Sequence, residues 1–278
     1  MLSDAQLTLG FISFLNCVPF FACLKDNGFS GDFAAGVPSE LNRMLQSGEL
    51  DVSPSSSFEY ARNWRDYVIL PQHSIASQGP VKSVLLFSPV ELHDLEGQNI
   101  AITGESATSI NLLRVLLREF YQLKNVTDKV PECAIEDLIR QKKPALLIGD
   151  RALRMAQNLP AGVKVFDLGE LWTRNTRLPF VFALWMIRKD AIAKYAESLK
   201  HLGSQLMKSR TQVLAHPHSF AETAARKTGI DAETIANYWQ TIDYRLDDEH
   251  QKGLKLFFSL CLKYGLLQQE PELHFLEQ

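Results

Sequence analysis

Two turns rich in serine and threonine carry the clearest chemical signal in the chain. Each follows a short apolar stretch and opens a helix: one spans Asp51 to Tyr60 and reads DVSPSSSFEY, and the other spans Ile100 to Ser109 and reads IAITGESATS. Such turns present backbone N–H groups and hydroxyls at the positive end of a helix, where a carboxylate or a phosphate is stabilised. Two of them predict a cleft that holds a small dianion at both ends.

The hydroxyls of these turns have a competing structural use, because serine and threonine also cap helices. Ser56 and Glu59 have the spacing of a capping box, and Ser83 begins an apolar stretch where it could be an inert buried hydroxyl. Capping accounts for one hydroxyl of the second turn and not for all three. The predicted substrate-binding residues are Ser56, Ser57, Ser83, Ser106, Thr108 and Ser109.

Two further polar residues are candidate catalytic groups. Asn16 stands in the loop after the first strand, where it either contacts a ligand or bonds its own backbone in a turn. Asp150 ends a buried strand and is either a reacting group or the N-cap of the next helix. Glu105 is a second candidate carboxylate. The histidines at positions 73, 216 and 218 have no obvious partners and are interpreted as structural or exposed.

Composition excludes several classes of function. The chain has 278 residues and a net charge of −3, so no basic field draws it to nucleic acid. No apolar run reaches the roughly 18 residues of a membrane helix, and residues 1–6 show no secretory signal pattern. The four cysteines have no disulfide or metal-ligand spacing, which predicts reduced thiols and a cytoplasmic protein. No nucleotide-binding glycine motif is present, so neither a cofactor nor a metal is expected.

Strands and helices alternate along the first two thirds of the chain, which predicts α/β sheets with ligands at the carboxyl ends of strands. The last third, from Asp190, is helical, with Asp190, Ser219 and Asp231 as candidate N-caps. One α/β unit is interrupted by another, with crossings near Ser88 and Phe180. The expected fold is type II periplasmic-binding-protein-like: two lobes, a hinge and an interlobe cleft. Lobe 1 is residues 1–88 plus 183–278, with the C-terminal helices, and lobe 2 is residues 89–182.

Short motifs follow one another in fixed order along the chain. They are SFLNCVP at 13–19, GVPSELN at 36–42, the DVSPSSSFEY turn, GPVKSVLLFS at 79–88, ESATS at 105–109, IGD at 148–150 and LPFVFA at 178–183. Together they resemble the chorismate dehydratases of the futalosine pathway of menaquinone biosynthesis. The similarity covers roughly the whole chain and is densest from Gly10 to Ala183. Phe14 stands where that family usually has tyrosine, and Cys17 where threonine is common.

The resemblance implies a hydro-lyase that converts chorismate to 3-[(1-carboxyvinyl)oxy]benzoate and water without a cofactor. Such an enzyme needs donors for two carboxylates, a base, and a polar group near the leaving hydroxyl. The second carboxylate of the substrate is itself a candidate base, beside Asp150 and Glu105. Two alternatives remain open: a solute-binding protein for a small dicarboxylate, and the sibling 1,4-dihydroxy-6-naphthoate synthase. The Leu15–Asn16 loop disfavours the sibling, and oligomeric state is not predicted.

Overall fold

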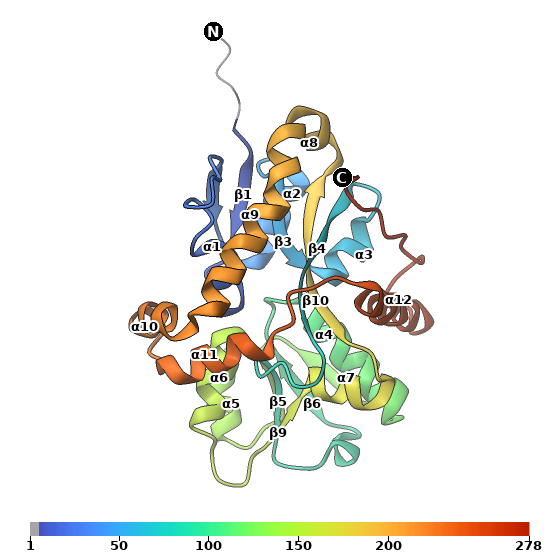
Figure 1. Cartoon of the computed structure of the whole chain (residues 1–278). Helices are drawn as coiled ribbons and strands as arrows, with labels where there is room; N and C mark the ends of the chain where they lie inside the picture. The colour runs from blue at the N-terminus through green and yellow to red at the C-terminus, as the bar shows by residue number, and fades with distance from the viewer. Residues whose placement is uncertain (1–5, 278) are drawn as a thin grey trace.

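A computed structural model describes residues 6–277 of the chain, in which strands from distant parts of the sequence form two mixed sheets (Figure 1). The N-terminal residues 1–5, which contributed to the signal-peptide prediction, lie outside the described residues. The first sheet has the order β2 (Asp32–Ala35), β1 (Thr8–Phe11), β3 (Val52–Ser56), β10 (Phe180–Arg188) and β4 (Tyr67–Ser77). The second has the order β7 (Thr127–Lys129), β6 (Asn99–Ile102), β8 (Ala145–Ile148), β5 (Val84–Ser88) and β9 (Lys164–Asp167).

Helices cover both sheets. With the first sheet are η1 (Leu15–Cys17), α1 (Val18–Phe21), α2 (Pro38–Ser47) and α3 (Ser57–Asn63). With the second are η2 (Leu92–Leu95), α4 (Ala107–Val115) continuing as the π-helix η3 (Leu116–Phe120), α5 (Ile135–Arg140), α6 (Gly149–Gln157) and α7 (Leu168–Thr176). The C-terminal third forms α8 (Lys189–Lys194), α9 (Ala196–Ala215), α10 (Pro217–Thr228), α11 (Ala232–Thr241) and α12 (Asp248–Lys263).

Local sequence signals explain several helix ends. Helix α2 begins at Pro38 and stops at Gly48, whose φ of 86° suits glycine. Asp231 caps α11 by accepting from the Thr234 N–H at 2.8 Å. The caps predicted at Asp190 and Ser219 are wrong, because the N-cap of α8 is Arg188 and that of α10 is His216, two and three residues earlier, and neither makes a side-chain capping bond.

The chain crosses between the two sheets twice, as expected, but the first crossing lies earlier than predicted. Strand β4 ends at Ser77 in the first sheet, and β5 begins at Val84 already paired with β8 and β9 of the second. Residues 84–88 therefore belong with the second sheet rather than with lobe 1. The second crossing lies at 177–179, between α7 and β10, so residues 180–182 belong with the first sheet. An apolar run such as VLLFS fits the middle of either sheet, so burial alone could not place it.

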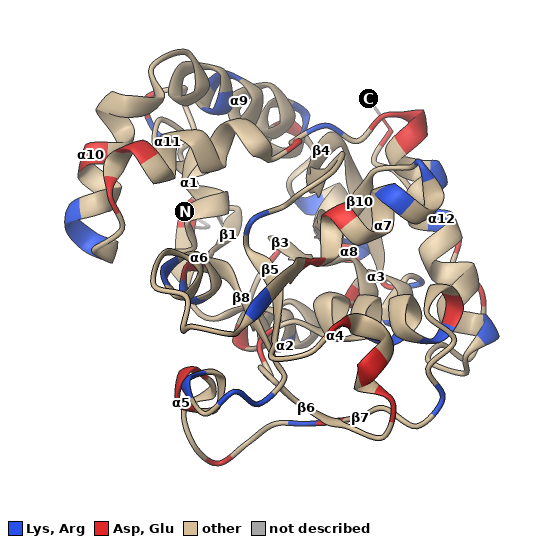
Figure 2. Ribbon diagram, turned by 90° about the horizontal axis from the view of Figure 1, so that it is seen from below, with Lys and Arg blue, Asp and Glu red and all other residues tan. Residues whose placement is uncertain are grey.

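The C-terminal helices do not rest on one lobe alone. Helix α9 packs on α1 and β4, while α12 packs on β10 but also on α4 of the second lobe. Helix α11 is tied to α6 through the Gln157 side chain, which donates to Asp231 at 2.7 Å. Charged segments of both signs are interspersed over these outer helices (Figure 2). No helix among the described residues is long and apolar enough to cross a membrane.

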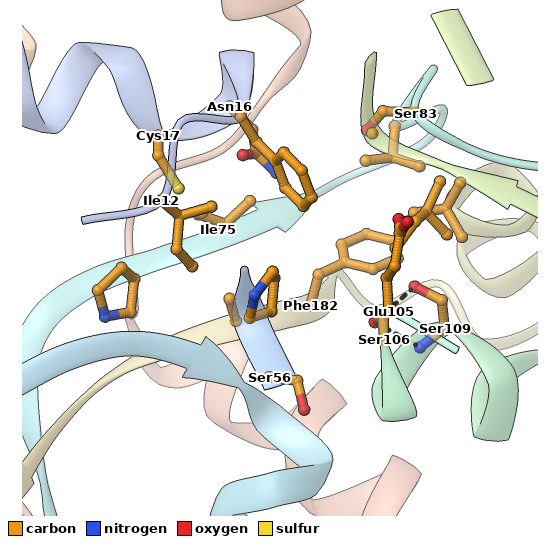
Figure 3. A pocket seen from close by; sticks show the side chains of 18 of the residues that line it. Ile12, Asn16, Cys17, Ser56, Ile75, Ser83, Glu105, Ser106, Ser109 and Phe182 are labelled. Atoms are coloured by element: carbon orange, nitrogen blue, oxygen red, sulfur yellow. Dashed lines mark hydrogen bonds between the residues drawn. The ribbon is translucent and has the colours of Figure 1, made fainter. Parts of the chain in front are cut away.

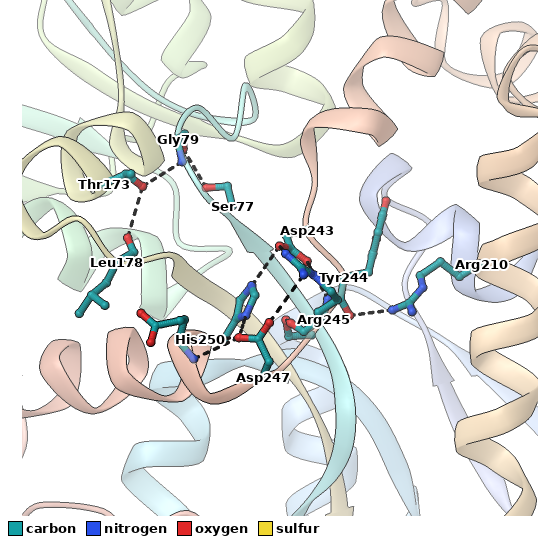
Figure 4. Close-up of polar contacts among 12 residues, drawn as sticks. Ser77, Gly79, Thr173, Leu178, Arg210, Asp243, Tyr244, Arg245, Asp247 and His250 are labelled. Atoms are coloured by element: carbon teal, nitrogen blue, oxygen red, sulfur yellow. Dashed lines mark hydrogen bonds and ion pairs between the residues drawn. The ribbon is translucent and has the colours of Figure 1, made fainter.

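A polar network surrounds the two crossings (Figure 4). The Thr173 hydroxyl accepts from the Gly79 N–H at 2.9 Å and donates to the Leu178 carbonyl at 3.4 Å, so it links one crossing to the other. Beside it, Asp243 exchanges two backbone hydrogen bonds with Ala76 at the end of β4, each 2.8 Å long. The segment between α11 and α12 is thereby fixed against the strand that leads into the first crossing.

Within this segment a buried histidine stands between two carboxylates. His250 Nδ1 lies 2.7 Å from Asp247 and its Nε2 lies 3.2 Å from Asp243, while Arg245 pairs with both aspartates. Burial alone would lower the pKa of His250, but the two carboxylates raise it. Burial alone would raise the pKa of Asp243, but His250 and Arg245 hold it well below its usual range.

The stability of the protein should therefore depend on His250 in one pH window. A raised folded-state pKa means that the contribution is complete below the unfolded value of about 6.5 and is lost as pH rises through the folded value. The lowered pKa of Asp243 means that its own contribution is complete above about pH 4 and is lost as pH falls toward the folded value. We expect His250→Gln to lower the free energy of unfolding more at pH 5.5 than at pH 9, measured by urea unfolding. His201→Gln is the control, because His201 lies on α9 with its side chain exposed. Equal losses at both pH values would contradict the prediction.

Candidate active site

A cleft between the two sheets collects polar side chains from segments far apart in sequence (Figure 3). Its empty volume, which includes space open to solvent, is about 670 Å³. The polar lining residues are Asn16, Cys17, Ser55, Ser56, Ser83, Glu105, Ser106 and Ser109. The apolar lining residues are Ile12, Phe14, Pro38, Pro54, Ile75, Val81, Val84, Ile148, Gly149, Phe182 and Ala183.

Asn16 enters the cleft from the short 3-10 turn η1. Its Oδ1 is buried and has no hydrogen-bond partner among the described residues. The neighbouring backbone is fixed on both sides, because the Leu15 N–H donates to Asp150 at 3.1 Å and the Leu15 carbonyl accepts from Trp239 Nε1 at 2.7 Å. A buried amide oxygen without a partner carries a desolvation penalty. Held in place by a fixed backbone, it is a group prepared for a ligand.

The N-terminus of α4 forms the opposite wall. Ser106 caps the helix, since its Oγ accepts from the Ser109 N–H at 3.2 Å, and the two hydroxyls lie 3.1 Å apart. One proton is shared between these hydroxyls, so the other can be donated into the cleft. The first-turn N–H groups of a helix have no intrahelical acceptors and carry its positive dipole end. This wall is therefore suited to a carboxylate, as the sequence predicted.

Two serines at the end of β3, Ser55 and Ser56, line the cleft between the Asn16 loop and the N-terminus of α4. Ser56 caps α3 by accepting from the Glu59 N–H at 3.3 Å and still faces the cleft. Ser55, which the sequence analysis did not select, lines the cleft with a buried Oγ that has no partner among the described residues. The capping-box spacing with Glu59 selected Ser56. No comparable signal in the sequence selected Ser55.

Ser83 lines the cleft from the second lobe, just before β5. Its Oγ lies 2.8 Å from the Tyr238 hydroxyl of α11, and both side chains are buried. Beside it, Gly149 opens α6 with φ of 60°, and the Phe14 ring lies 3.8 Å from the position of an added Cβ. Glycine is needed there because other residues rarely adopt this backbone conformation. Strand and helix ends of the second lobe thereby meet the η1 loop of the first.

Ser57 and Thr108 do not line the cleft, contrary to the substrate-binding role predicted for them. Thr108 Oγ1 accepts from the Phe58 N–H at 2.9 Å and lies 3.3 Å from Ser57 Oγ, which donates to the Val181 carbonyl at 2.8 Å. Both side chains are fully buried. These bonds join the N-terminus of α3 to that of α4, so the two residues connect the lobes. A sequence cannot distinguish a hydroxyl that faces a ligand from one that faces another helix.

The two candidate carboxylates differ in position. Asp150 is not a lining residue; it anchors the η1 loop, and burial raises its pKa against the hydrogen bond from Leu15 and the charge of Arg154. Glu105 does line the cleft and pairs with Arg151 at 3.4 Å. Arg151 pairs more closely with Glu136, at 2.8 Å. Asp150, which was predicted to be catalytic, therefore makes no direct contact with the cleft.

The electrostatic character of the cleft is set by neutral donors. No lysine or arginine is among the described residues that line the cleft, and Glu105 is the one carboxylate among them. Burial raises the pKa of the Cys17 thiol far above its ordinary value, so this lining group is neutral. Within residues 6–277 no three His, Cys, Asp or Glu side chains are grouped so that they could hold a metal ion.

The histidines selected from the sequence lie elsewhere. His73 is buried under α9, where its Nε2 lies 2.9 Å from the Gly203 carbonyl and burial lowers its pKa to about 4. His216 and His218 flank the start of α10 and are at least partly exposed. None of the three lines the cleft.

The fold is shared with solved binding proteins. The aliphatic sulphonate binding protein of Escherichia coli aligns over 99% of this chain and 94% of its own with a TM-score of 0.73 at 14% identity. An Archaeoglobus fulgidus protein aligns over 96% of this chain and 100% of its own with a TM-score of 0.71 at 17% identity. At such identities the likeness shows the two-lobed fold of periplasmic binding proteins and no more.

Sequence comparison reaches further. The chorismate dehydratase of Thermus thermophilus is 35% identical over 90% of this chain and 93% of its own, and that of Campylobacter jejuni is 26% identical over 94% and 100%. A family model described as menaquinone biosynthesis matches residues 7–263, which include every lining residue of the cleft. The chain therefore belongs to the menaquinone biosynthesis family.

Proposed function

We propose that this protein is a chorismate dehydratase, which converts chorismate to 3-[(1-carboxyvinyl)oxy]benzoate and water. The observation that carries the proposal is 35% identity over nearly the whole length of a chorismate dehydratase, combined with a cleft built for a dianion from neutral donors. We place the step in the futalosine route to menaquinone and the protein in the cytoplasm. All four cysteines, each within the described residues, are unpaired, which fits a reducing compartment.

The reaction removes a ring proton from the carbon that bears the enolpyruvyl ether and expels the adjacent hydroxyl as water. The proton is acidified through the ring carboxylate, and the ring becomes aromatic, which makes the step strongly downhill. Negative charge grows on the ring carboxylate as the proton leaves. Donors fixed at this carboxylate stabilise the transition state more than the ground state. We assign this role to the α4 N-terminus with Ser106 and Ser109, and the contact with the leaving hydroxyl to Asn16.

The remaining polar groups hold the second carboxylate and the ether arm. Ser55, Ser56 and Ser83 offer hydroxyls at positions fixed by a strand end, a helix cap and the Tyr238 bond. Fixed donors cost little reorganisation when the substrate binds, and correct orientation itself accelerates reaction. The apolar lining, with Phe182 and Phe14 among it, suits the carbocyclic ring.

The base is proposed to be the enolpyruvyl carboxylate of the substrate. Asp150 does not line the cleft and accepts from the η1 loop, while Glu105 lines the cleft and is paired with Arg151 at 3.4 Å. Asp150→Asn keeps an oxygen that accepts from Leu15, and Glu105→Gln removes only a charge. We expect each to retain kcat/KM within about tenfold, a barrier change of roughly 1.4 kcal/mol. A loss beyond about a thousandfold in either folded variant would assign the base to that residue.

The activity itself is tested by incubating purified protein with chorismate. The expected result is a new aromatic absorbance and the mass of 3-[(1-carboxyvinyl)oxy]benzoate, both absent with heat-denatured protein. Binding of chorismate without turnover would favour the alternative of a solute-binding protein for a small dicarboxylate. If chorismate is neither bound nor converted, the activity of the sibling 1,4-dihydroxy-6-naphthoate synthase should be tested next.

A further inference from the structure

We infer that helix α11 is a positioning element of the cleft. Its consecutive residues Tyr238 and Trp239 each hold one group of the cleft wall, and these two groups belong to different lobes. The inference rests on the proposed function for what the cleft does. Tyr238 reaches Ser83 at the start of the second lobe, and Trp239 reaches the backbone beside Asn16 in the first. Neither residue lines the cleft itself.

The bond to Ser83 determines what that hydroxyl offers to a ligand. Tyr238 is fully buried, its pKa is raised by that burial, and its hydroxyl lies 2.8 Å from Ser83 Oγ. A neutral phenol donates readily, and a hydroxyl has one proton and two acceptor positions. When Tyr238 donates, Ser83 is left with its own proton to donate into the cleft. Tyr238 therefore makes Ser83 a donor, which is the polarity that a carboxylate requires.

The bond to Leu15 fixes the backbone from which Asn16 projects. Trp239 Nε1 donates to the Leu15 carbonyl at 2.7 Å, in the peptide group that also contains the Asn16 nitrogen. Asp150 holds the Leu15 N–H from the other side at 3.1 Å. Within residues 6–277 the side chain of Asn16 makes no bond through Oδ1, so its direction depends on this backbone.

A single rigid helix carries both contacts. Consecutive residues on an α-helix project about 100° apart, so Tyr238 and Trp239 can point to different lobes. Helix α11 is capped by Asp231, which is also bonded to Gln157 of α6, and its Ile235 and Ala236 are buried. One helix therefore contacts both the Ser83 hydroxyl and the backbone of the Asn16 loop.

A double-mutant cycle tests the Tyr238 contact. Tyr238→Phe removes one hydroxyl, and we expect kcat for chorismate to fall about tenfold with a smaller change in KM, the scale of one lost hydrogen bond. In a Ser83→Ala background the same substitution should cost less than about twofold, since its effect passes through Ser83. Tyr60→Phe is the matched control: its buried hydroxyl bonds the backbone of Glu272 and His274, outside the cleft, and kcat should not change. Additive losses for Tyr238 and Ser83 would overturn the positioning role.

Hydrogen exchange tests the Trp239 contact without substrate. In Trp239→Phe, the amides of Leu15 and Cys17 should exchange at least about tenfold faster, because the loop loses an anchor. Trp172→Phe is the control, since Trp172 Nε1 likewise donates to a backbone carbonyl, that of Pro179, in a buried site away from the loop. Unchanged exchange in Trp239→Phe would overturn the inference. This readout separates the two proposals: a wild-type protein inactive on chorismate refutes the function, while loop exchange still decides whether α11 holds the loop.

Discussion

Replacing Asn16 with alanine should reduce kcat/KM for chorismate by about a hundredfold, since misorientation of a reacting group alone can cost that much. The residue is the one amide whose buried Oδ1 lines the cleft without a partner among the described residues. We assign it the contact with the hydroxyl that leaves, so its loss should lower kcat more than it raises KM. Steady-state kinetics on chorismate, followed by the aromatic product, measures both.

The same substitution should leave the fold intact. The Asn16 side chain has no partner through Oδ1 in the part of the chain that the structure describes, and its loop is held by backbone bonds to Asp150 and Trp239 that alanine preserves. Asn42→Ala is a close control: Asn42 also has a buried Oδ1 without a partner among residues 6–277, but it lies on α2 and does not line the cleft. Wild-type rates in Asn16→Ala would remove the residue from the mechanism, and equal losses in Asn42→Ala would point to a general effect.

Sequence signals predicted the walls of the cleft where function and local structure use the same residues. Ser56 ends β3 and Ser106 follows β6; both cap helices and line the cleft, so a capping pattern led directly to them. The predicted two-lobed fold is confirmed by the two sheets and by the solved binding proteins it resembles. Asn16 and Ser83 also line the cleft, as the loop position and the family resemblance implied.

The features that sequence could not supply depend on contacts between distant segments. Thr108 meets the backbone of Phe58 fifty residues away, and Tyr238 meets Ser83 at a separation of 155. Periodicity shows which side of a helix is apolar, but not which neighbour it meets. The same holds for the boundary near Ser88: strand β5 is buried along its whole length, and only its partners β8 and β9 show which sheet contains it.

Gly253→Ala should destabilise the protein by about 1–3 kcal/mol, the usual cost of forcing an extra methyl group into a packed interior. Gly253 lies in the buried face of α12, and a Cβ there would stand 2.1 Å from the Pro179 carbonyl oxygen. That atom belongs to the backbone of the second crossing and cannot rotate away. Either α12 or the crossing must shift, so the clash falls on the connection between the lobes.

Gly203→Ala provides the matched comparison for this clash. Gly203 is also in a helix interior, in α9, but a Cβ there meets only His73 Nε2 at 3.6 Å and Leu70 Cδ1 at 3.9 Å, which are ordinary contacts. Alanine is favoured over glycine in helices by about 1 kcal/mol, so this variant should be more stable than wild type. Urea unfolding of both variants gives the two free energies of unfolding. Helix propensity favours alanine equally at both sites, so opposite signs of the two changes in unfolding free energy would be due to the contact between α12 and the crossing. A Gly253→Ala variant more stable than wild type would contradict the prediction, because it would show that the crossing shifts without cost.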